Sequence, residues 1–161
     1  MAASLSHFDR TGRARMVDVG GKAVTARAAT AKCRIRVSSE LVRVLKEGTL
    51  EKGDAFTVAK TAGILAAKQT GTLIPMCHPL PLNVVEIDLV LDDAAGVVTV
   101  EATARTEAKT GVEMEAMVAV SVAAMAFYDI CTAVDKGMVI DTVHLAEKSG
   151  GKSGPYHNPL F

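Results

Sequence analysis

Tryptophan is absent from the sequence, and aromatic residues make up only 4% of its 161 positions. The core of such a chain has to be built from small side chains, chiefly alanine and valine. Hydrophobic residues nevertheless reach 49%, which argues against disorder over most of the length, and the length suits one domain of ordinary size. A core of small apolar side chains is often completed against another subunit, so this composition favours an oligomer.

Neither sign of charge is in excess, because 18 lysines and arginines balance 18 aspartates and glutamates. This balance argues against a general nucleic-acid or membrane-surface binder, which normally carries a basic excess. The sequence contains three cysteines, an odd number, and they are widely spaced at Cys33, Cys77 and Cys131. They favour free thiols in a reducing compartment over a disulfide framework. We therefore expect a cytoplasmic protein without nucleic-acid or membrane partners.

Long hydrophobic runs are missing as well. The longest charge-free stretch around the most apolar segment extends from Ala116 to Tyr128, which is shorter than the roughly 20 residues needed to cross a bilayer. We expect a buried helix there. Residues 4–15 are polar and charged, so they show no signal-peptide pattern. Both observations predict a soluble protein.

The spacing of apolar residues divides the chain into predicted strands and helices. Strict alternation, as at Ala31, Cys33 and Ile35, predicts a half-buried strand. A capping residue, such as Ser38 or Asp54, ahead of apolar residues at helical spacing predicts a helix. In chain order, the predicted elements are a strand at 24–37, a helix between Ser38 and Gly48, a helix at 56–69, strands at 85–92 and 97–106, a helix from 110 to about 134, and a strand at 138–145.

Without the first short helix, the predicted order is strand, helix, strand, strand, helix, strand. This order is typical of the ferredoxin-like α+β fold, an antiparallel sheet with helices packed on one face. We find no internal repeat and no linker, so we expect a single domain over residues 1–161. Within it, residues 1–22 are expected to form a loosely ordered arm and residues 155–161 a loosely ordered tail.

Three prolines lie between positions 75 and 81, where they exclude a helix or a central strand and predict a stiff extended loop. His78 in this loop suits proton transfer, because its reference pKa is near 6.5; the alternative is a polar side chain that only ties down the turn. The adjacent Cys77 and His78 cannot easily bind one ion, and no other metal-ligand spacing occurs. We expect neither a metal site nor a cofactor.

Two carboxylates, Glu113 and Glu115, open the most apolar predicted helix. Acids in the first turn of a helix interact favourably with the helix dipole, and this is a sufficient explanation for the presence of both residues. Glu115 and Asp129 share a helix face to within roughly 40°. Asp129 follows the charge-free stretch, so its carboxylate is expected to emerge into a pocket or an interface, where its pKa can shift toward a catalytic range. The alternative is an exposed acid at the end of a buried stretch.

The segment from Lys148 to Lys152 combines two lysines with two glycines. Glycines allow a close backbone approach to an anion and lysines supply charge, which suits phosphates. The segment does not match the Walker pattern, and a flexible basic tail is the other interpretation. Lys52, ahead of the second predicted helix, is a further candidate cation.

Together these segments closely resemble one family, the cyclic pyranopterin monophosphate synthases, also called molybdenum cofactor biosynthesis protein C. The proline-rich loop and the acidic helix start are very specific to it. The resemblance covers about residues 5–154 and is carried by MVDV at 16–19, KGD at 52–54, AGI at 62–64, AAK at 66–68, LIPMCHPL at 73–80, TGVEMEA at 110–116, YD at 128–129 and KSGGKSG at 148–154.

The resemblance implies a ferredoxin-like protomer that assembles as a homohexamer, a trimer of dimers. It implies a lyase that converts a 3′,8-cyclised dihydro-GTP to cyclic pyranopterin monophosphate with loss of pyrophosphate, and hence a nucleotide-derived triphosphate as substrate. Asp129 is implied as the catalytic residue. The residues implied to bind the substrate are Met76, Cys77, His78, Glu113, Met114, Glu115, Lys52, Lys148 and Lys152.

Thr132 departs from the family pattern, which has a lysine three residues after the catalytic aspartate. Threonine cannot donate an ammonium proton, which leaves a non-enzymatic alternative: an oligomeric phosphate-binding module of the same fold with impaired turnover. Lys136 falls within roughly 20° of the Asp129 face if the helix continues that far, and is expected to supply part of the missing charge. A rival enzyme class is nucleophilic catalysis by Cys77 or Cys131.

Overall fold

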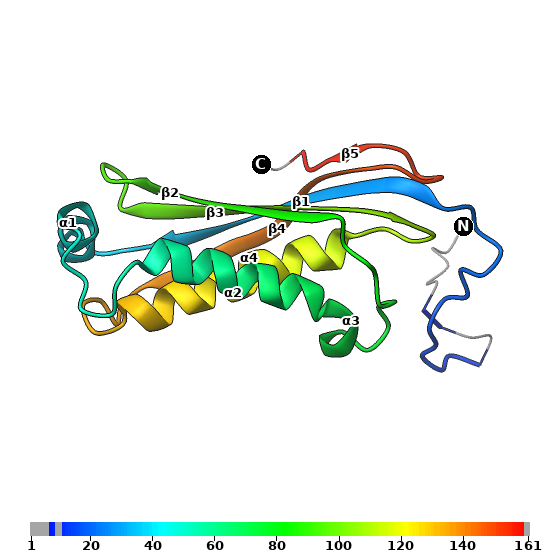
Figure 1. Ribbon diagram of the computed structural model, residues 1–161, viewed down its shortest axis with the longest axis horizontal. Coiled ribbons are helices and arrows are strands. Elements are labelled where there is room, and N and C mark those ends of the chain that lie inside the picture. Colours follow the sequence, from blue (N-terminus) through cyan, green and yellow to red (C-terminus); the bar gives the residue numbers. More distant parts are fainter. Residues whose placement is uncertain (1–6, 9–10, 160–161) are drawn as a thin grey trace.

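One antiparallel sheet organises the protein, with strand order β2-β3-β1-β4-β5. The computed structural model describes residues 7–8 and 11–159. Helices α2 and α4 cover one face of the sheet, and α1 lies at one end of it (Figure 1). The elements are β1 (Thr25–Arg36), α1 (Ser39–Glu47), α2 (Ala55–Lys68), α3 (Thr70–Leu73), β2 (Val84–Asp92), β3 (Val97–Ala108), α4 (Glu113–Cys131), β4 (Val139–Ser149) and β5 (Tyr156–His157).

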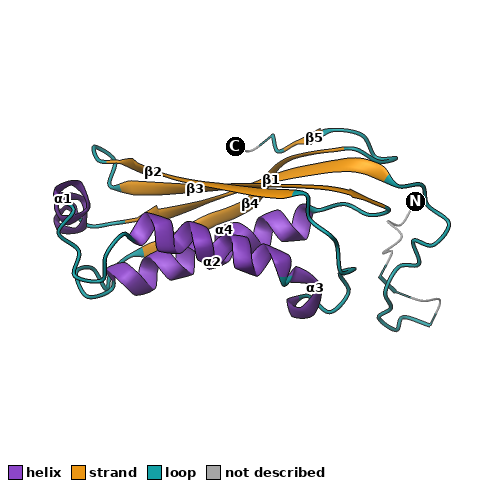
Figure 2. Cartoon of the chain, in the orientation of Figure 1, coloured by secondary structure: helices purple, strands orange, loops and turns teal. Residues whose placement is uncertain are grey.

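The element order confirms the predicted ferredoxin-like α+β fold. β1, α2, β2, β3, α4 and β4 follow one another as expected, and α1 is inserted after β1. Both long helices lie on the same side of the sheet (Figure 2). β1 is the central strand, because it pairs with β3 along one edge and with β4 along the other.

Side-chain caps start the first two helices where the sequence predicts them. Ser38 Oγ accepts a hydrogen bond from the backbone N–H of Leu41 at 3.2 Å, which caps α1. Gly48 ends α1 with φ of 64°, a left-handed conformation that glycine adopts without steric cost. Asp54 Oδ1 accepts from the N–H groups of Phe56 at 3.0 Å and Thr57 at 3.1 Å and caps α2.

The core lies between the sheet and the two long helices, and small side chains fill it. Ala102 of β3 and Ala119 of α4 are fully buried. Gly63 allows α2 to approach α4 closely, since a Cβ at this position would lie 2.8 Å from the carbonyl oxygen of Ala119. The rings of Phe56 and Phe127 add an aromatic contact between the same helices, with centroids 5.6 Å apart.

α4 is the one helix in the described ranges that is long and apolar enough to cross a membrane, judged by length and composition alone. It packs against β1 and β3 within the fold, and half of its most apolar window is buried there. The core helix of a soluble protein shows this same pattern. The prediction of a buried helix in this part of the chain is confirmed by its fully buried Ala116, Val120 and Phe127.

In the C-terminal half, the ends of α4 and β4 differ from the predicted boundaries. α4 ends at Cys131 rather than near residue 134, because the N–H groups of Val134 and Asp135 turn back to the carbonyl of Cys131. β4 continues to Ser149, so Lys148 belongs to the sheet and not to a flexible tail.

Part of the expected loose tail forms β5, which pairs with Glu147 and Lys148 along the exposed edge of β4. An open strand edge offers unpaired backbone groups to any nearby segment. In the N-terminal arm, the described residues contain an isolated bridge between Phe8 and Ala14. Residues 1–6, 9–10 and 160–161 lie outside the described part of the chain.

Candidate active site

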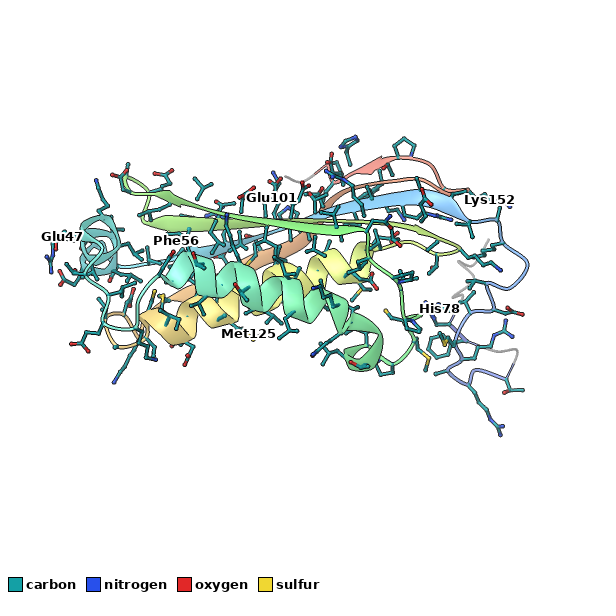
Figure 3. All side chains as sticks on the ribbon, in the orientation of Figure 1. Glu47, Phe56, His78, Glu101, Met125 and Lys152 are labelled. Atoms are coloured by element: carbon teal, nitrogen blue, oxygen red, sulfur yellow. The ribbon has the colours of Figure 1, made fainter. Side chains whose placement is uncertain are left out.

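A cavity of about 290 Å³ lies at the N-terminal end of α4. Three segments distant in sequence form its walls: the proline-rich loop, the segment that leads into α4, and the N-terminal arm. His78 marks this end of the molecule in Figure 3. The lining residues are Met76, Cys77, His78 and Leu80 from the loop, Thr110, Gly111, Glu113, Met114 and Glu115 from the helix start, and His7, Val17, Val19 and Lys22 from the arm.

The proline-rich loop is held at both ends. At its start, the N–H of Cys77 donates to the carbonyl of Ile74 at 3.0 Å and closes a turn directly after α3. At its end, the Thr106 hydroxyl of β3 donates to the carbonyl of Pro81 at 2.6 Å. His78 is thus presented on a backbone that is fixed from both sides, with its side chain half-buried at the cavity. A preorganised side chain loses little conformational freedom when it binds a ligand.

The two acids at the start of α4 differ in their surroundings. Glu113 Oε1 accepts a hydrogen bond from Lys148 Nζ at 2.7 Å, and the two side chains are 30% and 28% exposed. Glu115 is 3% exposed. Burial raises the pKa of Glu115, backbone hydrogen bonding at Glu115 partly opposes this, and the charge of Glu113 raises the pKa further. A carboxyl group of this kind can hold a proton and release it to a bound substrate.

Neither cysteine considered as a nucleophile lies in a setting that favours the thiolate. Burial raises the pKa of Cys77, and the charges of Glu115 and Glu113 raise it further. Burial also raises the pKa of Cys131 to about 11, with a smaller contribution from Asp135. Because the thiolate is the reactive form, the raised pKa values do not support nucleophilic catalysis by Cys77 or Cys131.

The glycine-rich segment after β4 packs tightly on the start of β1. Gly150 and Gly151 have φ of 91° and 75°, and a side chain at either position would collide with the backbone of Ala26 or the guanidinium of Arg27. Only glycine meets both requirements here. Lys152 follows, exposed, at the same end of the molecule as His78 (Figure 3).

Asp129 and Lys52 lie together at the other end of α4. Lys52 Nζ donates to the Asp129 carbonyl oxygen at 3.0 Å and is 3.9 Å from Asp129 Oδ2. The side chain of Asp129 is 75% exposed. Glu115 and Asp129 are 14 residues apart, so the helix separates them by about 21 Å along its axis. They are not neighbours within one chain.

The expected site residues therefore form two groups in one chain. Most of them lie at the cavity, and Asp129 with Lys52 forms the second group. Lys136 does not lie on α4, because the helix ends before this residue. The carbonyl of Lys136 accepts a hydrogen bond from the Tyr128 hydroxyl at 3.0 Å. The premise that Lys136 continues the face of Asp129 is wrong. Thr132 is the C-cap residue of α4.

The sequence did not indicate the contribution of the N-terminal arm to the cavity. The Gly20-Gly21 pair signals a turn, but its docking depends on contacts with distant residues. No group of three or more histidine, cysteine, aspartate or glutamate side chains within residues 7–8 and 11–159 is arranged to hold a metal ion.

The family model and the similar proteins described here all point to one family. The model of the MoaC family matches residues 16–151. A cyclic pyranopterin monophosphate synthase of Parvibaculum lavamentivorans is 52% identical over 155 residues, which cover 96% of this chain and 97% of that protein. Proteins of the same name from Cereibacter sphaeroides and Chloroflexus aurantiacus are 51% and 50% identical, each over 96% of this chain and over 97% and 95% of their own lengths.

Proposed function

Because the chain belongs to the MoaC family, we propose that it is a cyclic pyranopterin monophosphate synthase. It converts (8S)-3′,8-cyclo-7,8-dihydroguanosine 5′-triphosphate to cyclic pyranopterin monophosphate and pyrophosphate, as a lyase of molybdenum cofactor biosynthesis. The observation that carries the proposal is identity of 50% or more over nearly the full length of several relatives with this name. These relatives do not support the alternative of a phosphate-binding module without turnover. A biosynthetic role of this kind fits a cytoplasmic location.

The cavity supplies chemistry suited to this reaction. Rearrangement of a purine-derived ring needs proton transfers, and we assign these transfers to His78 and the buried Glu115, which both line the cavity. Met76, Cys77 and Met114 supply the apolar lining that a flat heterocycle requires. Release of pyrophosphate needs cations near the phosphates, a role that fits Lys148 and Lys152.

Asp129 requires a second copy of the chain to reach this cavity. Within one chain, Asp129 and Lys52 lie about 21 Å along α4 from Glu115. The Asp129 carboxylate is 75% exposed and therefore accessible to a neighbouring subunit. We infer that Asp129 and Lys52 of one protomer complete the cavity of another, with Asp129 as the catalytic residue.

The outer surface of the helix layer also supports an oligomer. Leu65 of α2 is 57% exposed and Met125 of α4 is 55% exposed. Met125 lies on the side of the helix layer that faces away from the sheet (Figure 3). We infer that these two side chains belong to a surface that associates with another protomer, because larger exposed apolar patches are typical of association sites. A homohexamer arranged as a trimer of dimers accommodates both this surface and the shared cavity.

The test is incubation of the purified protein with the cyclised GTP compound while pyrophosphate and the pterin product are measured. We expect both products in equal amounts from the wild type. Asp129→Asn should remain a folded oligomer by light scattering but lose turnover by about 10²–10⁴-fold, the usual contribution of a positioned proton-transfer group. Wild-type protein that yields no pyrophosphate would refute the function, and full activity in Asp129→Asn would refute the role of Asp129.

A further inference from the structure

We propose that Lys22 of the N-terminal arm contacts the phosphate groups of the substrate, and that the arm forms one wall of the substrate cavity. The inference rests on the proposed function for the identity of the phosphate-bearing ligand. It adds a residue and a segment that neither the family resemblance nor the sequence patterns indicate as functional.

The charge of the cavity favours a contact between Lys22 and the phosphates. Lys22 is the only lysine or arginine among the described lining residues, which also include the acids Glu113 and Glu115. Lys148 is paired with Glu113 at 2.7 Å, which offsets part of the charge that it can offer to the phosphates. A triphosphate brings several further negative charges into this acidic surrounding, so an additional cation at the cavity wall favours its binding. Within residues 7–8 and 11–159, Lys22 takes part in no ion pair with an acid.

The backbone beneath Lys22 is held by three hydrogen bonds. The N–H of Lys22 donates to the carbonyl of Val19 at 3.0 Å and closes a turn. Asp18 Oδ1 accepts from the N–H of Gly20 at 2.7 Å within the same turn. Lys109 Nζ donates to the carbonyl of Gly20 at 2.7 Å. These contacts fix the position of Lys22 and leave its ammonium group available for a ligand.

The contact from Lys109 also explains why the arm lies at this cavity. Lys109 directly precedes Thr110 and Gly111, which themselves line the cavity. The arm is therefore tied to the segment that leads into α4, beside Glu113. Lys109 acts as a positioning residue, because its effect on the ligand passes through the turn that carries Lys22.

The experiment compares Lys22→Ala, Lys22→Arg and the matched control Lys46→Ala in the full-length protein. Lys46 is also an exposed lysine, paired with Asp93 at 2.6 Å and located on α1, away from the cavity. Binding of inorganic pyrophosphate is measured by calorimetry, and KM and kcat are measured with the cyclised GTP compound. Thermal unfolding of each variant verifies that it is folded.

We expect Lys22→Ala to raise both the pyrophosphate Kd and KM on the order of ten-fold, the effect of losing one charge-assisted hydrogen bond, with a smaller change in kcat. Lys22→Arg should restore most of the binding, and Lys46→Ala should match the wild type. Kd and KM values in Lys22→Ala equal to those of Lys46→Ala would overturn the proposal, and so would a failure of Lys22→Arg to restore binding.

The role of Lys109 is tested by a double-mutant cycle. Lys109→Met should raise the pyrophosphate Kd when Lys22 is present and have little further effect in Lys22→Ala, because both changes remove the same contact. Independent, additive effects would overturn the positioning role. If wild-type protein binds pyrophosphate in a manner that depends on Lys22 yet releases none from the cyclised GTP compound, the proposed function fails while the phosphate contact stands.

Discussion

Gly63 is the position where one added methyl group tests the packing of the two long helices. A Cβ there would lie 2.5 Å from Ile87 Cδ1, 2.8 Å from the Ala119 carbonyl oxygen and 3.1 Å from Ala123 Cβ. On an exposed helix surface, glycine to alanine stabilises by about 1 kcal/mol. Here overpacking costs about 1–3 kcal/mol. We expect the upper value, because the oxygen of Ala119 belongs to the backbone of α4 and can move only with that helix.

The net effect of Gly63→Ala is therefore a loss of about 2 kcal/mol, which lowers Tm by roughly 4–8 °C in a chain of this size. Thermal unfolding should be followed at one fixed protein concentration, because the proposed subunit association would add to the apparent stability. A Tm raised in Gly63→Ala would refute the reasoning, since it would mean that helix propensity outweighs the contact with α4.

A second substitution separates the clash from other causes. Ile87→Val removes the Cδ1 atom nearest to the new methyl group. In the wild type this change should cost about 0.5–1.5 kcal/mol. In the Gly63→Ala background it should cost clearly less, because it relieves part of the overlap. Equal costs in both backgrounds would show that the clash with Ile87 does not contribute.

Four further changes test the site. His78→Ala should weaken substrate binding and turnover with little change in Tm, because the loop is held by backbone contacts on both sides; a large fall in Tm with unchanged kinetics would contradict this. Glu115→Gln should be more stable than the wild type above pH 4.5 and lose that advantage below it. The reason is that burial raises the pKa of Glu115, so ionisation of the wild-type side chain destabilises the fold as pH rises; an advantage independent of pH would exclude this cause. Thr132→Lys should increase pyrophosphate release by adding a cation close to Asp129, whereas Lys136→Ala should have the same small effect with either residue at position 132. A neutral Thr132→Lys would show that the family lysine has no equivalent role here, and a large effect of Lys136→Ala would contradict its position beyond α4.

Local sequence signals were sufficient for most of the fold. The alternation in β1 and the caps at Ser38, Gly48 and Asp54 depend on residues within a few positions of each other, so the sequence shows them directly. The proline-rich loop and the acids at the start of α4 were equally visible. These signals placed one wall of the cavity and the helix that supports it.

The end of α4 depends on a distant contact and could not be predicted in this way. Thr132, Ala133 and Val134 show no strong stop signal, so the expected helix ran past them. In the structure, Asp135 is buried and its Oδ2 accepts a hydrogen bond from the N–H of Ser38 at 2.7 Å. This contact joins the end of α4 to the cap of α1 across 97 positions of the chain.

The contribution of the N-terminal arm to the cavity could not be predicted from the sequence for the same physical reason. Its docking depends on the hydrogen bond from Lys109 to Gly20, which lie 89 positions apart. The separation of Asp129 from Glu115 is a different case. Helical angles correctly relate their faces, but the rise along the axis puts them at opposite ends of the helix.

The two ends of α4 have a genetic consequence. If each cavity takes Glu115 from one copy of the chain and Asp129 from another, an allele altered at His78 and an allele altered at Asp129 damage different halves of the same site. Each allele alone leaves every site defective. When both are expressed in one cell, mixed assemblies contain some sites built from two intact halves. Two loss-of-function alleles of this protein would then complement each other, even though both lie in a single gene.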